Sequence, residues 1–481
     1  MTKGLLVPGR VLVAALVVAC GVVPAWARRA PAPGGTAVVS VPPELLEATL
    51  EAHSFAPLFV PRGGQLGGDV ATPGAPEHTS NVIAELEPVT TAGEVLGTSW
   101  RLRAWAPAPD VAHAVTRCLA PHAVPGSKTP RTTFASAVLA AAGVTVEVVG
   151  RHEDVVVRFN KPVFVVAELL TACPLRPASG APTGPYAVQA PGRLAWRSGS
   201  YEAPPLLGAI ELRGPLTGSE RADVVVAHGE SSLSAGATLL SPWPDVIALV
   251  QEPDTVVSDP LGLADDEGAG LFSFRQGLRA DLLAATWGAG RGGPTEALLP
   301  PGVAPARPLP PPPASAPSLP LALVPLPRDA PRVTLAVGAD DALSDAVAER
   351  LAVLLRGRRT LLEVKRGEQG KSGSADVELV RWRPPSRDAA VSLLAFVGAR
   401  AGLLNEPAVQ KATADARLLG ADPAQRLGAA LALERALLDE RLVVPLIVVD
   451  RSIVVDPDLR GVILRGDGVP LLDGAWWGGG R

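Results

Sequence analysis

The sequence contains few of the residues that form metal sites and few aromatic residues. Among its 481 residues are three cysteines, one methionine and two tyrosines, and Phe, Trp and Tyr together make up 4%. The six histidines are scattered over the first half of the chain, and no two stand at helical spacing beside a glutamate. Because neither an HExxH motif nor a Cys/His cluster occurs, the sequence argues against a zinc site and against metalloprotease chemistry.

Motifs for nucleotide binding and covalent catalysis are missing or stand in the wrong context. Residues 288–293, GAGRGG, match the spacing G-x-G-x-x-G, but they do not lead from a strand into a helix. The stretch GEQGKSG, 367–373, contains Gly-Lys-Ser, yet Lys365 stands where a phosphate loop needs its first glycine, so a hairpin turn is expected instead. A G-x-S-x-G elbow and calcium-loop spacing are absent too. We therefore predict a protein that is not an enzyme and binds no metal or cofactor.

The chain also lacks a strong net charge and a long apolar run. Its formal net charge is -4 at pH 7, which predicts no nucleic-acid partner. The apolar run Val11 to Val23 is shorter than the roughly 20 residues that a membrane-spanning helix needs.

Residues 1–27 instead predict an export signal. Basic residues flank the start of the apolar segment, and Ala25 and Ala27 occupy the small-residue positions of a cleavage site. A second interpretation also fits, because the residues that end in Cys20 resemble a lipobox, in which Cys20 would be lipidated. We expect a periplasmic or extracytoplasmic protein, either cleaved after Ala27 or anchored through Cys20.

Two cysteines remain beyond the export signal. Cys118 and Cys173 would lie in an oxidising compartment, where a disulfide between them could persist. Such a bridge would close a long loop and contribute about 4 kcal/mol in the chain-entropy model. Two separately buried thiols are the alternative.

The first half of the chain is rich in expected strands. Apolar alternation predicts strands at 36–42 and 99–105, and a helix follows from about Asp110. The runs 144–149 and 154–159 predict a hairpin across the polar GRHE. This half reads as strands with interspersed helices.

The second half changes character after a proline-rich segment. Residues 300–331 contain 13 prolines and predict an extended surface connection. Beyond it we expect, in order, a strand at 332–338, an amphipathic helix at 340–357, strands at 361–366 and 376–382, a helix from Asp422 to Glu440 and a buried strand at 442–450. Alternation of this kind predicts a doubly wound α/β lobe.

Short motifs occur in an order that resembles one protein family, the family 5 extracellular solute-binding proteins. The stretch PTGPYAV, with Thr183, Gly184, Pro185 and Tyr186, is similar to the family's G-T-G-P-Y element. Further similar stretches are GGTAVVSVP, NVIAELEP, SWRLRAW, HEDVVVRFNKPVFVVAELL, SGSYE, RLVVPLIV, DLRGV and LLDGAWW. Members of the family are the dipeptide-, oligopeptide- and nickel-binding components of ABC importers.

The resemblance implies an α/β fold of the type II periplasmic-binding-protein kind, with mixed sheets flanked by helices and a ligand cleft between two lobes. We expect lobe I at 28–257, with a smaller subdomain at about 45–180. Lobe II is expected at 258–441 and includes the proline-rich connection, and 442–481 would return to lobe I. By analogy with the family we expect a monomer.

The stretch RWRPPSRDA is similar to the family's W-x-A/G-D-Y-x-D-P turn, whose first Asp receives the α-ammonium group in peptide binders. Trp382 matches the family's Trp and Asp388 its second Asp, whereas Pro385 stands where the ammonium-binding Asp belongs. The resemblance implies Trp382, Arg383 and Asp388 as ligand-binding residues. Trp382 could stack on the ligand or fill the core of lobe II, and nearby arginines could favour an anionic or hydroxyl-rich ligand or simply be surface residues.

Three functions are compatible with these observations, and the third, a secreted hydrolase, rests only on the expected export. In the first, the exported protein captures a small solute, peptide-like or other, and delivers it to the permease of an ABC importer. In the second, it is a diverged relative that no longer transports and acts as a sensor or interaction protein with a vestigial cleft. The low aromatic fraction favours the second, because clefts of this family are usually lined by aromatic residues.

Overall fold

The computed structural model describes most of the chain beyond residue 33. The described ranges are 34–61, 78–80, 82–91, 94–120, 133–151, 154–171, 173–197, 205–216, 220–227, 237–240, 243–251, 292–305, 332–338, 342–357, 361–366, 375–414, 420–465 and 468–478. The predicted export signal, Cys20 and most of the proline-rich connection lie outside these residues.

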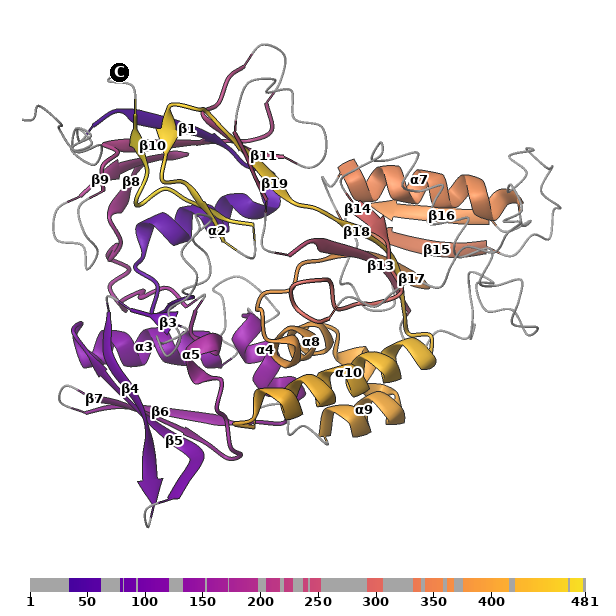
Figure 1. The fold of residues 1–481 in the computed structure, drawn as a ribbon, viewed down its shortest axis with the longest axis horizontal. Helices are drawn as coiled ribbons and strands as arrows, with labels where there is room; N and C mark the ends of the chain where they lie inside the picture. Colours follow the sequence, from indigo (N-terminus) through magenta and orange to yellow (C-terminus); the bar gives the residue numbers. More distant parts are fainter. Residues whose placement is uncertain are drawn as a thin grey trace, which may run out of the picture.

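The first of three large sheets draws its strands from both ends of the chain (Figure 1). Its order is β12-β19-β11-β1-β10-β9-β8. The strands are β1 (Thr36–Ser40), β8 (Tyr186–Ala190), β9 (Arg193–Trp196), β10 (Ala209–Arg213), β11 (Val224–Ala227), β12 (Ala237–Leu240) and β19 (Ser452–Val455). Helix α2 (Pro43–Ser54) packs on this sheet through Leu45, in a core of its own. We call this unit lobe I.

The second sheet is antiparallel and forms the subdomain. Its order is β4-β5-β7-β6, with β4 (Ile83–Thr91), β5 (Glu94–Ala104), β6 (Val146–Arg151) and β7 (Asp154–Phe159). Helices α3 (Ala108–Leu119), α4 (Phe134–Ala141) and α5 (Val166–Leu169) share its core. The predicted hairpin at 144–159 is confirmed as β6 paired with β7.

The third sheet has helices on both faces and forms lobe II. Its order is β14-β18-β13-β17-β15-β16, with β13 (Asp245–Gln251), β14 (Gly292–Pro294), β15 (Arg332–Val337), β16 (Leu361–Arg366), β17 (Val377–Trp382) and β18 (Val443–Val449). Helix α7 (Ala342–Gly357) covers one face. Helices α8 (Ala389–Gly398), α9 (Pro407–Ala414) and α10 (Pro423–Asp439) cover the other, with the 3-10 turn η2 (Ala401–Asn405) between α8 and α9.

The helix signals of lobe II are confirmed. The apolar face expected on the helix at 340–357 is buried, since Leu343, Val347, Leu351 and Leu354 all lie in the core under α7. Asp422 caps α10 by accepting a hydrogen bond from the amide of Ala424 at 2.9 Å. Short pairs complete the described chain: β2 (Val60–Pro61) with β3 (His78–Thr79), β20 (Leu459–Arg460) with β23 (Trp476–Trp477), and β21 (Ile463–Leu464) with β22 (Pro470–Leu471).

The hairpin predicted across GEQGKSG is wrong. Strands β16 and β17 do not pair with each other, because β15 lies between them and pairs in parallel with both. Parallel neighbours cannot be joined by a tight turn. Residues 367–374 of the connection lie outside the described residues.

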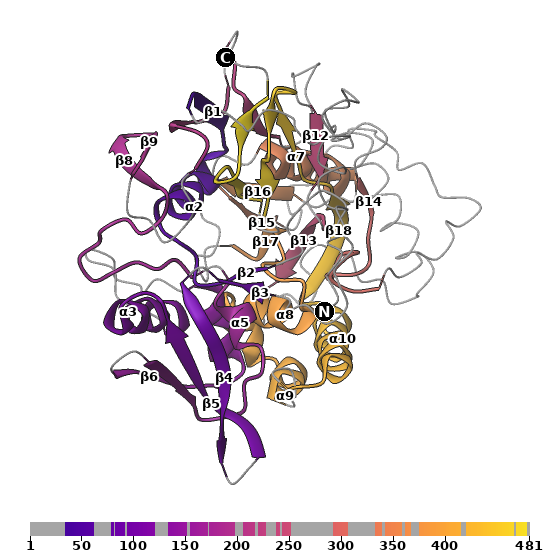
Figure 2. The ribbon, with the colours of Figure 1, turned by 60° about the vertical axis from the view of Figure 1, so that its left-hand side comes forward.

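Two strands cross between lobe I and lobe II, and this displaces the expected boundaries. Residues 245–251 and 443–449, which we assigned to lobe I, form β13 and β18 and pair with each other in the lobe II sheet. Hydrophobic runs that suit either sheet cannot reveal which sheet a strand joins, because pairing partners are distant in sequence. The chain therefore passes between the lobes next to β13 and again between β18 and β19 (Figure 1), and β13 and β18 lie next to each other (Figure 2). Among the described residues, no helix is long and apolar enough to cross a membrane.

Candidate functional site at the junction of the lobes

The turn that follows β17 contains the residues singled out by the sequence. Trp382 closes the strand, and its side chain is only 6% exposed. Its ring meets the ring of Phe396 on α8 edge to face, with centroids 5.3 Å apart. Of the two interpretations of Trp382, the structure places the ring in the hydrophobic core that lobe II shares with the subdomain.

The two prolines after Trp382 turn the chain toward α8. The indole Nε1 of Trp243 donates a hydrogen bond of 3.0 Å to the carbonyl of Pro384, which ties the approach to β13 to this turn. Pro385 is partly buried. Next to it, the buried Ser386 donates from its hydroxyl to the carboxylate of Glu168 on α5. The turn of lobe II is thus hydrogen-bonded to the subdomain.

Asp388 starts α8. One carboxylate oxygen accepts from the amides of Ala390 at 2.9 Å and Val391 at 3.2 Å, as an N-cap does. The other accepts from Nε of Arg426 on α10, also at 2.9 Å. These contacts give Asp388 a role in holding α8 on α10, and a contact with a ligand remains a prediction.

Arg383 belongs to a cluster that the sequence did not reveal. Its Nε lies 3.4 Å from Oδ2 of Asp245, and Nε of Arg381 donates to the same oxygen at 2.8 Å. Arg451, which follows β18, pairs with Oδ1 of Asp245. We call Asp245, Arg381, Arg383 and Arg451 the junction cluster. No sequence signal could have found it, because Asp245 and Arg451 come together only where the two strands cross.

Burial and charge oppose each other in the junction cluster. Asp245 and Arg451 are each 1% exposed at the side chain. Burial on its own raises the pKa of Asp245, but the guanidinium groups of Arg451, Arg381 and Arg383 outweigh it and lower that pKa to about 2. Burial lowers the pKa of Arg451 to about 10; Asp245 opposes this effect, and Arg383 and Arg381 add to it. Asp245 and Arg451 therefore both remain charged at neutral pH.

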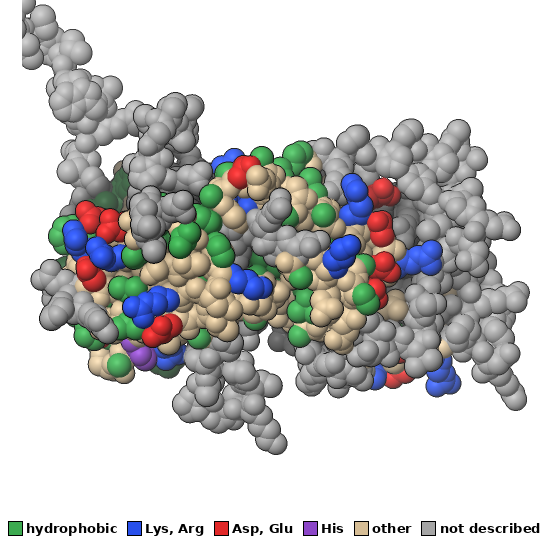
Figure 3. Space-filling view, turned by 90° about the horizontal axis from the view of Figure 1, so that it is seen from below, with side chains coloured by type: hydrophobic (Ala, Val, Ile, Leu, Met, Phe, Trp, Pro, Cys, Tyr) green, Lys and Arg blue, Asp and Glu red, His purple; other side chains and the backbone are tan. Residues whose placement is uncertain are grey.

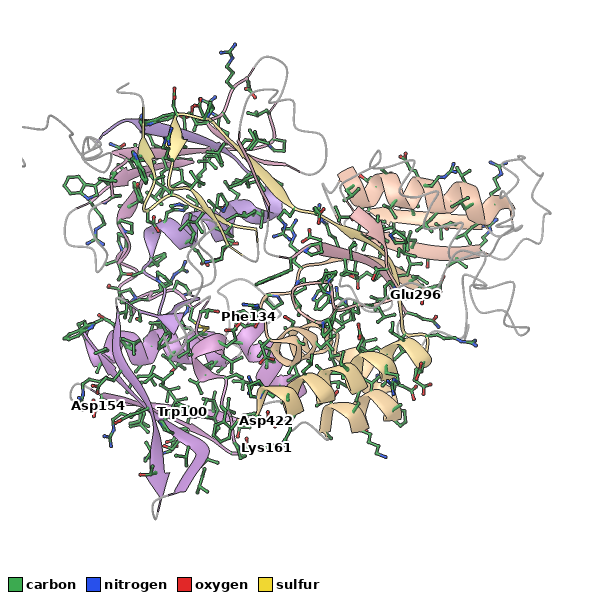
Figure 4. The ribbon with its side chains drawn as sticks, viewed as in Figure 1. Trp100, Phe134, Asp154, Lys161, Glu296 and Asp422 are labelled. Carbon is green, nitrogen blue, oxygen red and sulfur yellow. A yellow bond between two sulfur atoms is a disulfide. The ribbon has the colours of Figure 1, made fainter. Side chains whose placement is uncertain are left out.

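Helix α8 is buried along nearly its whole length between lobe II and the subdomain. Every residue from Ala389 to Val397 is buried. At its end, Gly398 lies against the backbone of Ala137 on α4, so closely that a Cβ at 398 would overlap the Ala137 carbonyl oxygen. Figure 4 labels Phe134 at the start of α4 and Asp422 at the start of α10, the helices that lie on the two sides of α8.

This arrangement of sheets and helices is found in known binding proteins. The structure matches the ABC transporter-associated periplasmic binding protein DppA from Helicobacter pylori, in complex with the peptide STSA, over 93% of this chain and 98% of that one. The TM-score is 0.65 and the sequence identity is 11%. The chain has the fold of the family 5 solute-binding proteins.

Two further proteins share this binding-protein fold. NikA from Staphylococcus aureus, in complex with Ni(L-His)2, matches with a TM-score of 0.64 at 11% identity, over 90% of this chain and 97% of that one. The murein tripeptide binding protein MppA from Escherichia coli matches with a TM-score of 0.65 at 13% identity, over 93% and 99%. The unliganded open form of MppA gives 0.55 at 13% identity, over 93% and 98%. No protein-family model matches the sequence, and no curated protein matches it.

The T-G-P-Y element joins lobe I to the start of the subdomain within the binding-protein fold. Thr183 accepts from the amide of Ala56 at 3.1 Å and donates to the carbonyl of Leu175 at 2.6 Å. A Cβ on Gly184 would lie 2.8 Å from the carbonyl oxygen of His53, so only glycine fits there. Tyr186 is buried, and its hydroxyl donates to the carbonyl of Leu207 at 3.3 Å. Packing and backbone hydrogen bonds therefore account for the residue types at Thr183, Gly184 and Tyr186.

Cys118 and Cys173 are joined by a disulfide, with their Cα atoms 5.7 Å apart. The bridge links the end of α3 to the segment after α5, so it lies within the subdomain. The disulfide cross-links the core next to α5, the helix whose Glu168 contacts lobe II.

The described residues present neither a metal cluster nor a field of one sign on the face in Figure 3. Across the described ranges, no group of three or more His, Cys, Asp or Glu side chains is placed to hold a metal ion. Figure 3 shows basic and acidic side chains interspersed over that face. The buried junction cluster is therefore the most distinctive concentration of charge that we identify at the lobe junction.

Proposed function

We propose that this protein is an exported solute-binding protein that encloses a small solute between lobe I and lobe II and delivers it to the permease of an ABC importer. One observation carries the proposal: the two lobes are connected through β13 and β18, which lie side by side. Paired crossings of this kind act as a hinge, and closure around a ligand gives a transporter a distinct form to recognise.

The higher similarity to DppA in complex with the peptide STSA than to the unliganded open form of MppA supports a closed arrangement of the lobes, with TM-scores of 0.65 and 0.55. In this arrangement the turn after β17 faces the subdomain, to which Ser386 is hydrogen-bonded. A solute enclosed near this turn would be largely removed from water. Its charged groups would then need partners in the protein.

An unblocked peptide is a poor candidate for this solute. In the peptide-binding relatives, an Asp receives the α-ammonium group, and Pro385 stands at that position here. A buried ammonium group without a carboxylate loses a charge-assisted hydrogen bond and is desolvated, at a cost of several kcal/mol. We propose a solute without a free amino terminus.

A second function is favoured by the packing of α8. Because Gly398 meets the backbone of Ala137 and all nine residues from Ala389 to Val397 are buried, opening would have to expose a continuous apolar interface. A protein held closed in this way would be a non-transporting relative that acts as a sensor or interaction protein.

The radius of gyration of the mature protein separates the two functions. Small-angle X-ray scattering on protein that has been unfolded and refolded to remove any retained solute should show expansion relative to the calculated closed form. Addition of the solute, or of an extract of small molecules from the native host, should then contract it. A refolded protein that keeps the closed dimensions under all conditions would exclude hinge closure and favour the second function.

A further inference from the structure

The junction cluster brings three guanidinium groups to one carboxylate. Asp245 is the first residue of β13, Arg381 and Arg383 come from the end of β17 and the turn after it, and Arg451 lies between β18 and β19. The side chains of the three arginines are 6%, 17% and 1% exposed in that order. The cluster therefore lies where both crossing strands meet the turn of the candidate site.

Arg451 contributes two buried donor atoms that no described residue satisfies. Its Nη2 pairs with Asp245, whereas Nε and Nη1 are buried and have no hydrogen-bond partner in the part of the chain that the structure describes. A guanidinium group has five N–H donors and always carries its charge. Leaving such donors unpaired in the interior costs more than leaving neutral ones, so buried arginines normally meet enough acceptors.

The position of the Arg451 guanidinium is fixed by its neighbours. On one side, the group lies against Gly468, where an added Cβ would overlap Nη1 and would be 2.7 Å from Cζ. Gly468 has a φ of 87°, a conformation that glycine adopts without strain. On another side, Asp245 holds Nη2. A group held in this way is preorganised, so it loses little side-chain entropy when it binds an acceptor.

An ion pair that only held the two strands together would not need three arginines around one carboxylate. One arginine satisfies one carboxylate, as Arg426 does for Asp388 at 2.9 Å. In the junction cluster, the buried guanidinium group of Arg451 lies close to those of Arg381 and Arg383, although the positive charges repel one another. An additional negative charge at this place would relieve that repulsion and accept from the unpaired donors.

We infer that the junction cluster binds an oxyanion group, a carboxylate, phosphate or sulfate, through Nε and Nη1 of Arg451 with support from Arg381 and Arg383. The inference rests on the proposed function, because it names a negatively charged group as the part of the solute that lies at the crossing strands. Asp245 acts as the positioning residue that holds the arginines. A free inorganic oxyanion offers the same chemistry, and the experiment below distinguishes it from the solute's own group.

The test is isothermal titration calorimetry on the refolded mature protein at constant ionic strength. The probes are sulfate, inorganic phosphate, benzoate and succinate. Wild-type protein should bind at least one of them, and Arg451→Gln should bind it about tenfold or more weakly, because a charge-assisted contact is lost. Asp245→Asn keeps an oxygen that accepts from the arginines but loses the competing negative charge, so it should bind the probe more tightly, by several-fold. Opposite shifts of the two variants would not follow from general destabilisation.

Two further variants keep the result interpretable. Arg383→Gln changes the most exposed arginine of the cluster and should weaken binding by several-fold if Arg451→Gln does not fold. Arg158→Gln is the matched control, since Arg158 pairs with Glu147 at 3.3 Å on the surface, and it should bind as the wild type does. Equal binding of all probes assigns the site to a free oxyanion, and a preference for carboxylates assigns it to the solute.

The inference is overturned if the wild type binds none of these probes, or if Arg451→Gln and Arg383→Gln bind as tightly as the wild type. The proposed function can fail separately. A retained solute without an acidic group would overturn the inference alone, whereas oxyanion binding by a protein that retains no solute and never opens would remove only the transport role.

Discussion

Gly398 of α8 lies in backbone contact with Ala137 of α4, so a Cβ placed on Gly398 would stand 3.0 Å from the Cα of Ala137 and overlap its carbonyl oxygen. Gly398 belongs to lobe II and Ala137 to the subdomain, and the two residues are more than 250 positions apart in the sequence. Only glycine permits this approach. The contact fixes how closely the two units lie and makes the interface sensitive to a single methyl group.

Gly398→Ala should destabilise the protein by about 1–3 kcal/mol, because the added methyl group forces α4 and α8 apart. Gly428→Ala is the matched control: Gly428 lies inside α10, and nothing stands within 4 Å of a Cβ there. That variant should stabilise the protein by up to about 1 kcal/mol through helix propensity. Urea unfolding of both variants measures the difference. Equal effects of the two substitutions would mean that α4 and α8 are not in backbone contact.

Trp382→Ala should cost about 3–5 kcal/mol of unfolding free energy, since it removes a buried ring and its contact with Phe396. Trp382→Phe should cost less, because part of the ring contact is kept. The dissociation constant of the solute or oxyanion probe should change little in Trp382→Phe. A variant with unchanged stability and lost binding would instead show that the ring stacks on the ligand.

His53 should make the protein sensitive to acid. Its ring is buried, with Nδ1 2.8 Å from the Thr49 carbonyl, and Nε2 accepts from the amide of Leu472 at 3.1 Å. Burial, partly offset by the Thr49 contact, lowers the pKa of His53 to about 4. The folded state therefore binds fewer protons than the unfolded state between about pH 4 and 6.5. The stability that His53 contributes is complete above pH 6.5 and is lost as the pH falls toward 4.

Asp473 acts in the opposite direction. Burial raises its pKa to about 7, so the stability that its protonated form contributes is present below pH 4 and is lost as the pH rises to 7.

Two variants test these assignments. The unfolding free energy of His53→Gln should rise by on the order of 3 kcal/mol relative to that of the wild type as the pH falls from 7 to 4. Asp473→Asn should gain relative to the wild type as the pH rises over the same interval. Unfolding free energies that stay parallel at all pH values would refute both assignments.

Pro385 provides a test of the solute class. Wild-type protein should not bind unblocked di- to pentapeptides at micromolar concentration, since the resemblance implies that Pro385 stands where the peptide binders have their ammonium-binding Asp. N-acetylated peptides serve as the control for contacts that do not involve the amino terminus. Micromolar binding of an unblocked peptide, abolished by acetylation, would show that another group receives the ammonium.

The sequence predicted the elements of this fold better than their partners. Asp422 and Pro423 predicted the start of α10, and the apolar alternation of 154–159 predicted β7. Both predictions succeeded because helix caps and hydrophobic periodicity are local signals. The pairing of 245–251 with 443–449 in the lobe II sheet was not foreseen, since pairing between distant strands leaves no local mark.

For the candidate site too, the sequence led to some residues and not to others. The resemblance led to Trp382, Arg383 and Asp388, which do lie on one turn beside α8, but the contacts of Asp388 are those of a helix cap. Asp245 and Arg451 stayed hidden because an ion pair between residues about 200 positions apart exists only in the folded chain. An arginine in an arginine-rich sequence does not stand out by itself.

Native mass spectrometry of the mature protein, purified from its own host under mild conditions, tests the central claim most directly. If the protein captures a solute, the spectrum should contain a population heavier than the polypeptide by the mass of one small molecule. Unfolding and refolding should remove that mass, and adding the released molecule back should restore it. A protein with the mass of the polypeptide alone, whose melting temperature no released or added solute changes, would contradict the claim that it captures a solute between its lobes.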